Sequence, residues 1–169
     1  MSKRTILTLL AATVMILQAA AQTVTTSNLS REMRGAKINF KMDFTNAEIY
    51  GMTEPEFAEY EKDWNSDNPT IVRNCRKAVG LTVRKLYDIG THKGAAYTLS
   101  VIVTKVTDEG FIICNATLTD SKGTVLFSVE DLTGGNEPTF SPGTKLAKMK
   151  VWSALVGRKL GSILKKEAK

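Results

Sequence analysis

The chain has 169 residues, with 23 Lys and Arg, 17 Asp and Glu and a single His, which gives a formal net charge of +6. Its hydrophobic fraction of 43% and charged fraction of 24% are those of a folded globular chain and exclude a disordered or collagen-like protein. Two Cys and one His also exclude a disulfide-dense mini-protein and a zinc site rich in Cys and His.

The N-terminus has the pattern of an export signal. Two positive residues precede an apolar run at residues 6–17, and small alanines follow at residues 19–21. This pattern predicts a signal peptide over residues 1–21, cleaved before Gln22. An uncleaved membrane anchor is the alternative, but a run of about a dozen apolar residues is short for a span. We therefore expect a periplasmic or extracellular mature chain with no transmembrane segment.

Residues 22–36 are polar and lack periodicity, which predicts a flexible lead-in before a single domain at residues 37–169. The domain opens with alternating apolar residues at 38–44, the pattern of a half-buried strand. Thr53 and Glu56 form a capping-box pattern that starts a short acidic helix, which runs to about Trp64. This helix is expected to bury Phe57, Tyr60 and Trp64.

A second helix start at Asp67-Asn68-Pro69 predicts an amphipathic helix that runs to about Ile89 and stops at Gly90. Its apolar positions recur at spacings of three and four: Ile71, Val72, Cys75, Ala78, Val79, Val83 and Leu86.

Three alternating strands follow, with turns that end in Gly110 and Gly123. Their inward positions are Tyr97, Leu99, Val101 and Val103, then Ile112, Cys114, Ala116 and Leu118, then Val125, Phe127 and Val129. We expect one hairpin to pair Val103 with Cys114, Val101 with Ala116 and Leu99 with Leu118. The next hairpin should pair Leu118 with Val125, Ala116 with Phe127 and Cys114 with Val129, because this register puts every apolar side chain on one face.

After a loop at residues 133–143, Ser141-Pro142 predicts the start of a last helix. Its apolar stripe is Met149, Trp152, Val156, Leu160 and Ile163. Ser153, Gly157 and Gly161 recur every four residues and predict close packing on a neighbouring element. The resulting order, β-α-α-β-β-β-α, predicts an α+β fold with a four-stranded, mainly antiparallel sheet and helices packed on one face.

Cys75 and Cys114 both point at the predicted core. In an oxidising compartment they could form a disulfide; the alternative is two buried free thiols that act as small apolar residues.

No catalytic constellation is evident in the sequence. His92 lies in a Gly-flanked loop, where a lone histidine is usually solvated, and the acids of residues 43–67 favour a solvated acidic face over an acid–base pair or a calcium site. We therefore expect no enzymatic activity, no cofactor and no metal. A hydrolase with a non-standard site at His92 and nearby acids is the third-ranked alternative.

Two cationic helix faces predict a site for an anionic ligand or surface, such as a glycan or a lipid headgroup. Its candidate residues are Arg73, Arg76, Lys77, Lys148, Lys150, Arg158 and Lys159. The alternative is that these bases balance the acidic segment between domains or subunits. The predicted export argues against nucleic acid.

The outer face of the predicted sheet carries Thr, Ser and Asn with five apolar residues among them, a pattern that indicates a contact surface. The candidate interface residues are Ile102, Val106, Phe111, Ile113 and Leu126.

The segments INFKMDF, YTLSVIVTKV, GTVLFSVED and VWSALVGRKLGSILKK span most of residues 37–166. In order and hydrophobic pattern they resemble a group of small bacterial cell-envelope α+β domains, which includes the N-terminal domain of TolB and the periplasmic domain of CsgG. The resemblance implies binding to other envelope proteins or oligomerisation, without catalysis. The chain differs from lipidated members in lacking the anchor Cys, and from TolB in lacking the propeller.

We therefore expect an exported, non-enzymatic envelope protein that acts through a protein partner or a homo-oligomer. A binding module for an anionic ligand is the alternative.

Overall fold

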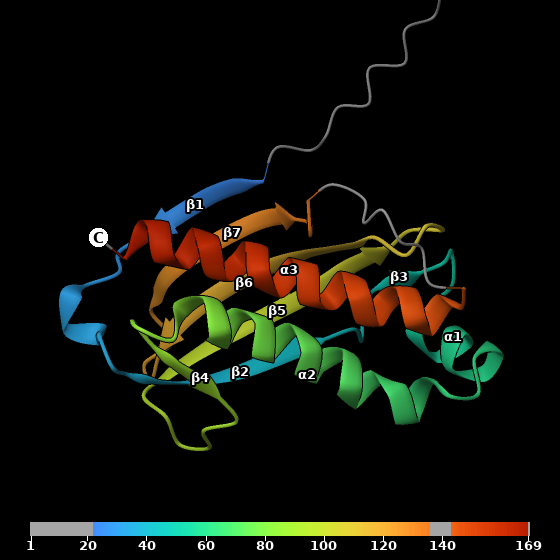
Figure 1. Ribbon diagram of the computed structural model, residues 1–169, viewed down its shortest axis with the longest axis horizontal. Coiled ribbons are helices and arrows are strands. Elements are labelled where there is room, and N and C mark those ends of the chain that lie inside the picture. The colour runs from blue at the N-terminus through green and yellow to red at the C-terminus, as the bar shows by residue number, and fades with distance from the viewer. Residues whose placement is uncertain (1–21, 136–142, 169) are drawn as a thin grey trace, which may run out of the picture.

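The computed structural model describes residues 22–135 and 143–168 and has an α+β fold (Figure 1). The elements are β1 (Thr23–Ser27), a single 3-10 turn η1 (Arg31–Met33), β2 (Lys37–Asp43), β3 (Glu48–Ile49), α1 (Glu54–Tyr60), α2 (Trp64–Val83), β4 (Asp88–Gly90), β5 (Tyr97–Val106), β6 (Ile112–Asp120), β7 (Val125–Leu132) and α3 (Lys145–Glu167). The predicted signal peptide and the Ser141-Pro142 helix start lie outside the described residues. Within them, Thr144 caps the start of α3, and its side-chain oxygen accepts the Ala147 N–H.

The strands form one mixed sheet in the order β1-β7-β6-β5-β2-β4, and β3 also pairs with β5. Strands β5, β6, β7 and β1 pair antiparallel, whereas β2 runs parallel to both β4 and β5. The predicted four-stranded, mainly antiparallel sheet is therefore wrong in strand number and direction. Strand β2 lies parallel to β5 because α1 and α2 intervene in the chain as a crossover, whereas a short turn would force an antiparallel neighbour.

The segment expected to be a flexible lead-in holds β1, which pairs with β7 at the edge of the sheet. The β1 sequence, TVTTS, is rich in β-branched residues, but most of its side chains are exposed. It lacks the alternation of apolar and polar residues by which a half-buried strand is recognised.

Helices α2 and α3 lie side by side on one face of the sheet, as Figure 1 shows, and their C-terminal ends lie at the same end of the molecule. The small residues Ser153, Gly157 and Gly161 are buried at their contact. A β-carbon on Gly161 would lie 2.6 Å from that of Thr82 on α2. The predicted close packing of this stripe is confirmed.

The boundaries of the first two helices differ from the prediction. Helix α1 ends at Tyr60, and α2 starts at Trp64, so Pro69 lies inside α2. Helix α2 ends at Val83, before the predicted Ile89, because the next residues turn and form β4 beside β2. Because β2 and β4 are far apart in the chain, their pairing gives no signal in the local sequence around Ile89.

The capping box at the start of α1 is confirmed. The Glu56 carboxylate accepts the Thr53 N–H at 2.8 Å and the Thr53 hydroxyl at 2.7 Å. Phe57 and Trp64 are buried as expected. Tyr60 is 62% exposed instead, and the centroid of its ring lies 4.1 Å from the ammonium of Lys145, a cation–π contact at the surface.

The predicted register is confirmed between β5 and β6, where Val103 pairs with Cys114, Val101 with Ala116 and Leu99 with Leu118. Between β6 and β7 the predicted partners are wrong by two residues at Leu118 and Ala116 and by three residues at Cys114. Leu118 pairs with Phe127, Ala116 with Val129 and Cys114 with Leu132.

The shift between β6 and β7 begins at the turn that joins them. The Asp120 carboxylate accepts the N–H groups of Lys122 and Thr124, which tightens the turn, and the ladder bulges next to Leu118. A shift of two residues keeps Phe127 and Val129 on the core face. The bulge beside Leu118 pairs Val125 with Thr119 instead and leaves Val125 41% exposed.

Candidate functional site

The face of the sheet opposite α2 and α3 is one candidate site, because no helix of the described residues covers it. We call this surface the outer face, made of Thr98, Ser100, Ile102, Ile113, Asn115, Thr117, Thr119, Leu126 and Ser128. These residues alternate with buried ones along β5, β6 and β7. None of the nine carries a charge. Toward the edges of the sheet the same side carries charged residues: Lys41 and Asp43 of β2 and Glu130 of β7.

One row across the outer face illustrates its chemistry. Lys41 of β2, Ser100 of β5, Thr117 of β6, Ser128 of β7 and Thr26 of β1 lie in register on five strands. Only the end position, on β2, carries a charge. The middle of the row therefore offers hydroxyl groups on a flat sheet, which can be covered without burying an unpaired charge.

Three of the five predicted interface residues lie on the outer face. Ile102 is 43% exposed, and Ile113 and Leu126 are partly buried. Val106 does not lie there: its side chain is fully buried in the core. The cause is a bulge between Val103 and Lys105, which reverses the alternation of the last residues of β5.

Phe111 is the other misplaced interface residue. Its ring lies on that of Trp152 of α3, with the centroids 4.2 Å apart and the ring planes at 57°. Phe111 therefore extends the hydrophobic core toward α3 and does not lie on the outer face, where it was predicted.

The seven predicted anion-binding residues do not form one cluster. Lys150 is paired with Asp67, with its Nζ 2.6 Å from a carboxylate oxygen, and the Arg73 guanidinium donates to the Thr70 hydroxyl at 3.2 Å. Lys148 packs beside Gly110.

Lys159 lines a separate hollow, together with Lys166 and Glu167. Arg76 is half-buried on α2 and lines none of the hollows described here. Lys77 and Arg158 line the same hollow, which lies between α2 and α3.

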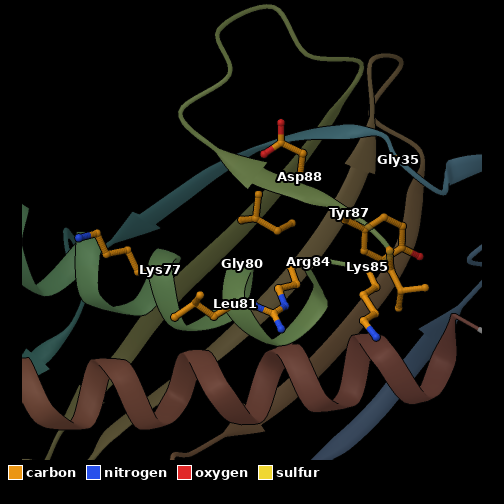
Figure 2. A pocket seen from close by; sticks show the side chains of 10 residues that line it. Gly35, Lys77, Gly80, Leu81, Arg84, Lys85, Tyr87 and Asp88 are labelled. Atoms are coloured by element: carbon orange, nitrogen blue, oxygen red, sulfur yellow. The ribbon is translucent and has the colours of Figure 1, made fainter.

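That hollow is part of a larger basic surface at the C-terminal ends of α2 and α3. We call it the basic groove, lined by Lys77, Leu81, Arg84, Lys85, Arg158 and Lys165. Its widest part has a volume of about 680 Å³. In Figure 2 the charged ends of Arg84 and Lys85 point toward α3, whereas the Asp88 carboxylate points away from it.

Four residues of the groove were not predicted to belong to a site: Leu81, Arg84, Lys85 and Lys165. The signal present in the sequence is helical spacing: Leu81 lies four residues after Lys77, and Arg84, the C-cap residue of α2, lies three residues after Leu81. Lys85 follows directly after Arg84 in the turn beyond α2. The contribution of Lys165 depends on α3 ending beside α2, which is a tertiary feature.

Cys75 and Cys114 are both buried in the core, and the structure has them as free thiols. Burial raises the pKa of Cys114 to about 12, and it raises the pKa of Cys75 further, with an added contribution from the neighbouring Cys114. Thiols held in the neutral form are poor nucleophiles, so neither residue is activated for catalysis.

His92 has one carboxylate near it, with Nε2 lying 3.2 Å from an Asp88 oxygen. The acids of α1 are placed differently: Glu56 caps its helix, and Glu54 accepts the indole N–H of Trp64 at 2.6 Å. In residues 22–135 and 143–168, no group of three or more His, Cys, Asp or Glu is arranged to hold a metal ion. Nor does this part of the chain contain a helix long and apolar enough to cross a membrane.

Comparisons with known proteins identify no family for the chain. No family model matches it, and no curated protein matches it. It is similar to one solved structure described as "Crystal structure of uncharacterized protein", with 9% identity over 83% of this chain and 93% of that one, at a TM-score of 0.39. A likeness at this level does not bear on function.

Proposed function

We propose that the chain is an exported, non-enzymatic protein of the bacterial cell envelope that binds a protein partner or its own copy through the outer face. The observation that carries the proposal is that α2 and α3 cover one face of the sheet and leave nine uncharged positions on the other. The pattern of residues 1–21 supports export.

The composition of the outer face suits contact with another protein. The core of a protein interface is depleted in charged residues because a charge buried without a partner is costly. Ser100 and Thr117, which pair across β5 and β6, can each donate and accept a hydrogen bond, and neighbouring Ile102 adds exposed apolar surface.

The test is the size of the mature chain, residues 22–169, measured by sedimentation and by crosslinking in the native cell. We expect a dimer or a crosslinked envelope partner, and its loss in the double variant Ser100→Arg and Thr117→Arg. The two arginines reach solvent easily in the free chain but would bring unpaired charges into the interface. Thr91→Arg, on an exposed loop residue, is the matched control and should change nothing.

A second candidate function, binding of an anionic ligand, is favoured by the basic groove. Of the seven basic residues predicted for this role, only Lys77 and Arg158 line it, but Arg84, Lys85 and Lys165 complete a continuous cationic surface.

A further inference from the structure

We propose that the basic groove docks on an anionic phospholipid surface, with Leu81 entering the headgroup region while the surrounding cations contact phosphates. The proposal gives the second candidate function a specific ligand. It uses the helix-covered side of the molecule and does not depend on the outer face.

The three hollows of the basic groove adjoin one another around Leu81. Leu81 lines three adjoining hollows: the widest with Arg84 and Lys85, a second with Lys77 and Arg158, and a third with Arg84, Lys85 and Lys165. Helix α2 with the turn that follows it, and helix α3, therefore bring five cations to the surroundings of a single aliphatic side chain.

These cations are not neutralised by neighbouring acids. One acidic residue, Asp88, is among the residues that line the three hollows. Its carboxylate lies 3.2 Å from His92 Nε2 and points away from α3 (Figure 2). In residues 22–135 and 143–168, the ion pairs join Lys105 to Glu48 and Lys150 to Asp67, and Asp88 contacts the His92 imidazole. None of these contacts involves a cation of the groove.

Two helix C-termini offset part of the positive charge, but not most of it. The ends of α2 and α3 each carry the equivalent of roughly half a negative charge. Together they cancel about one of the five cations. The groove is therefore still strongly positive toward an approaching anion.

Leu81 favours a lipid surface over a soluble anion. Its side chain is 68% exposed, the most exposed of the large hydrophobic residues in the described chain. A soluble polyanion would use the cations but not the aliphatic group. A bilayer offers phosphates and hydrocarbon side by side, which is why interfacial proteins combine exposed aliphatic residues with Lys and Arg.

The experiment measures cosedimentation of the mature chain with vesicles. We expect binding to vesicles of equal parts phosphatidylglycerol and phosphatidylcholine, no binding to phosphatidylcholine alone, and weakening by salt. Each cation near an anionic bilayer contributes about fivefold in affinity, so Arg84→Gln with Lys85→Gln should weaken binding about 25-fold. Lys37→Gln with Lys41→Gln, two exposed lysines of β2, is the matched control and should leave binding unchanged.

The variant Leu81→Ser separates the lipid surface from a soluble polyanion. It should weaken binding to the anionic vesicles and leave binding to immobilised heparin unchanged. All three groove residues changed here are exposed, so the variants should fold, as circular dichroism would verify.

Three results would overturn the proposal: no vesicle binding by the wild-type chain, vesicle binding unaffected by Leu81→Ser, or binding to heparin without binding to vesicles. None of them bears on the outer face, whose test is the oligomer or crosslinked partner.

Discussion

Gly157 of α3 faces the backbone carbonyl of Cys75 of α2 so closely that a β-carbon on Gly157 would overlap the carbonyl oxygen. The same β-carbon would lie 2.9 Å from that of Ala78. The separation of the two helices over the core is therefore set by the absence of a side chain at position 157.

Gly157→Ala should accordingly destabilise the fold. The added methyl group must push α3 away from α2, and overpacking of this kind costs about 1–3 kcal/mol. Chemical denaturation of the mature chain measures the free energy of unfolding. Gly143→Ala is the control, because a β-carbon there has nothing within 4 Å, and it should change stability by less than about 0.5 kcal/mol. Equal effects of the two substitutions would contradict the observed helix contact.

The register of the sheet can be tested with two valines whose predicted and observed positions are opposite. Val106, predicted on the outer face, is fully buried, whereas Val125, predicted in the core, is 41% exposed. Val106→Ala should therefore cost about 2 kcal/mol through lost burial and a cavity. Val125→Ala should cost less than about 0.5 kcal/mol. The reverse order, measured by thermal or chemical unfolding, would favour the register predicted from the sequence.

The two cysteines should behave as buried free thiols. A thiol reagent such as Ellman's should react with neither Cys75 nor Cys114 in the native chain, because both are buried in the neutral form. In denaturant the same reagent should detect both. Detection of neither in denaturant, followed by both after reduction, would show that the chain carries the alternative disulfide.

Stability should fall at alkaline pH. Burial raises the pKa of Cys114 to about 12 from the 9.0 expected when unfolded, and it also raises that of Cys75. A raised folded pKa contributes stability that is complete below the unfolded value of 9.0 and is lost as pH rises through the folded value. Tyr50, whose pKa is raised to about 12 mainly by burial, adds to the loss above its unfolded value of 10.0.

The measurement is the unfolding midpoint as a function of pH. The double variant Cys75→Ala and Cys114→Ala should show a shallower decline just above pH 9, where the unfolded thiols begin to ionise. A midpoint that is flat across this range in the wild-type chain would contradict the burial of the thiols.

The sequence predicted strand register and helix starts correctly where the local pattern of residues determines them. The alternation around Val101 and Ala116 gave the register of β5 on β6, and the capping residues Thr53 and Glu56 gave the start of α1. The prediction failed where a β-bulge changes which side chains of a strand face the core. One bulge after Val103 moved Val106 into the core, and another beside Leu118 moved Val125 out of it.

The candidate sites were predicted only in part, for a related reason. Ile102 on the outer face follows from strand alternation alone. Lys165 belongs to the basic groove only because α3 runs parallel to α2 and ends beside it, and this arrangement depends on Gly157 and Gly161. Short strands such as β4, with three residues, carry too little pattern to be predicted before their partners are known.

Site-specific photocrosslinking in the native cell tests the proposed function most directly. A photoreactive residue at position 113, on the outer face, should give a crosslinked product with a partner or a second copy. The same residue at position 93, in the exposed loop after β4, should give none. Products of equal yield at both positions, or a product only at position 93, would contradict the claim that this protein acts through the uncovered face of its sheet.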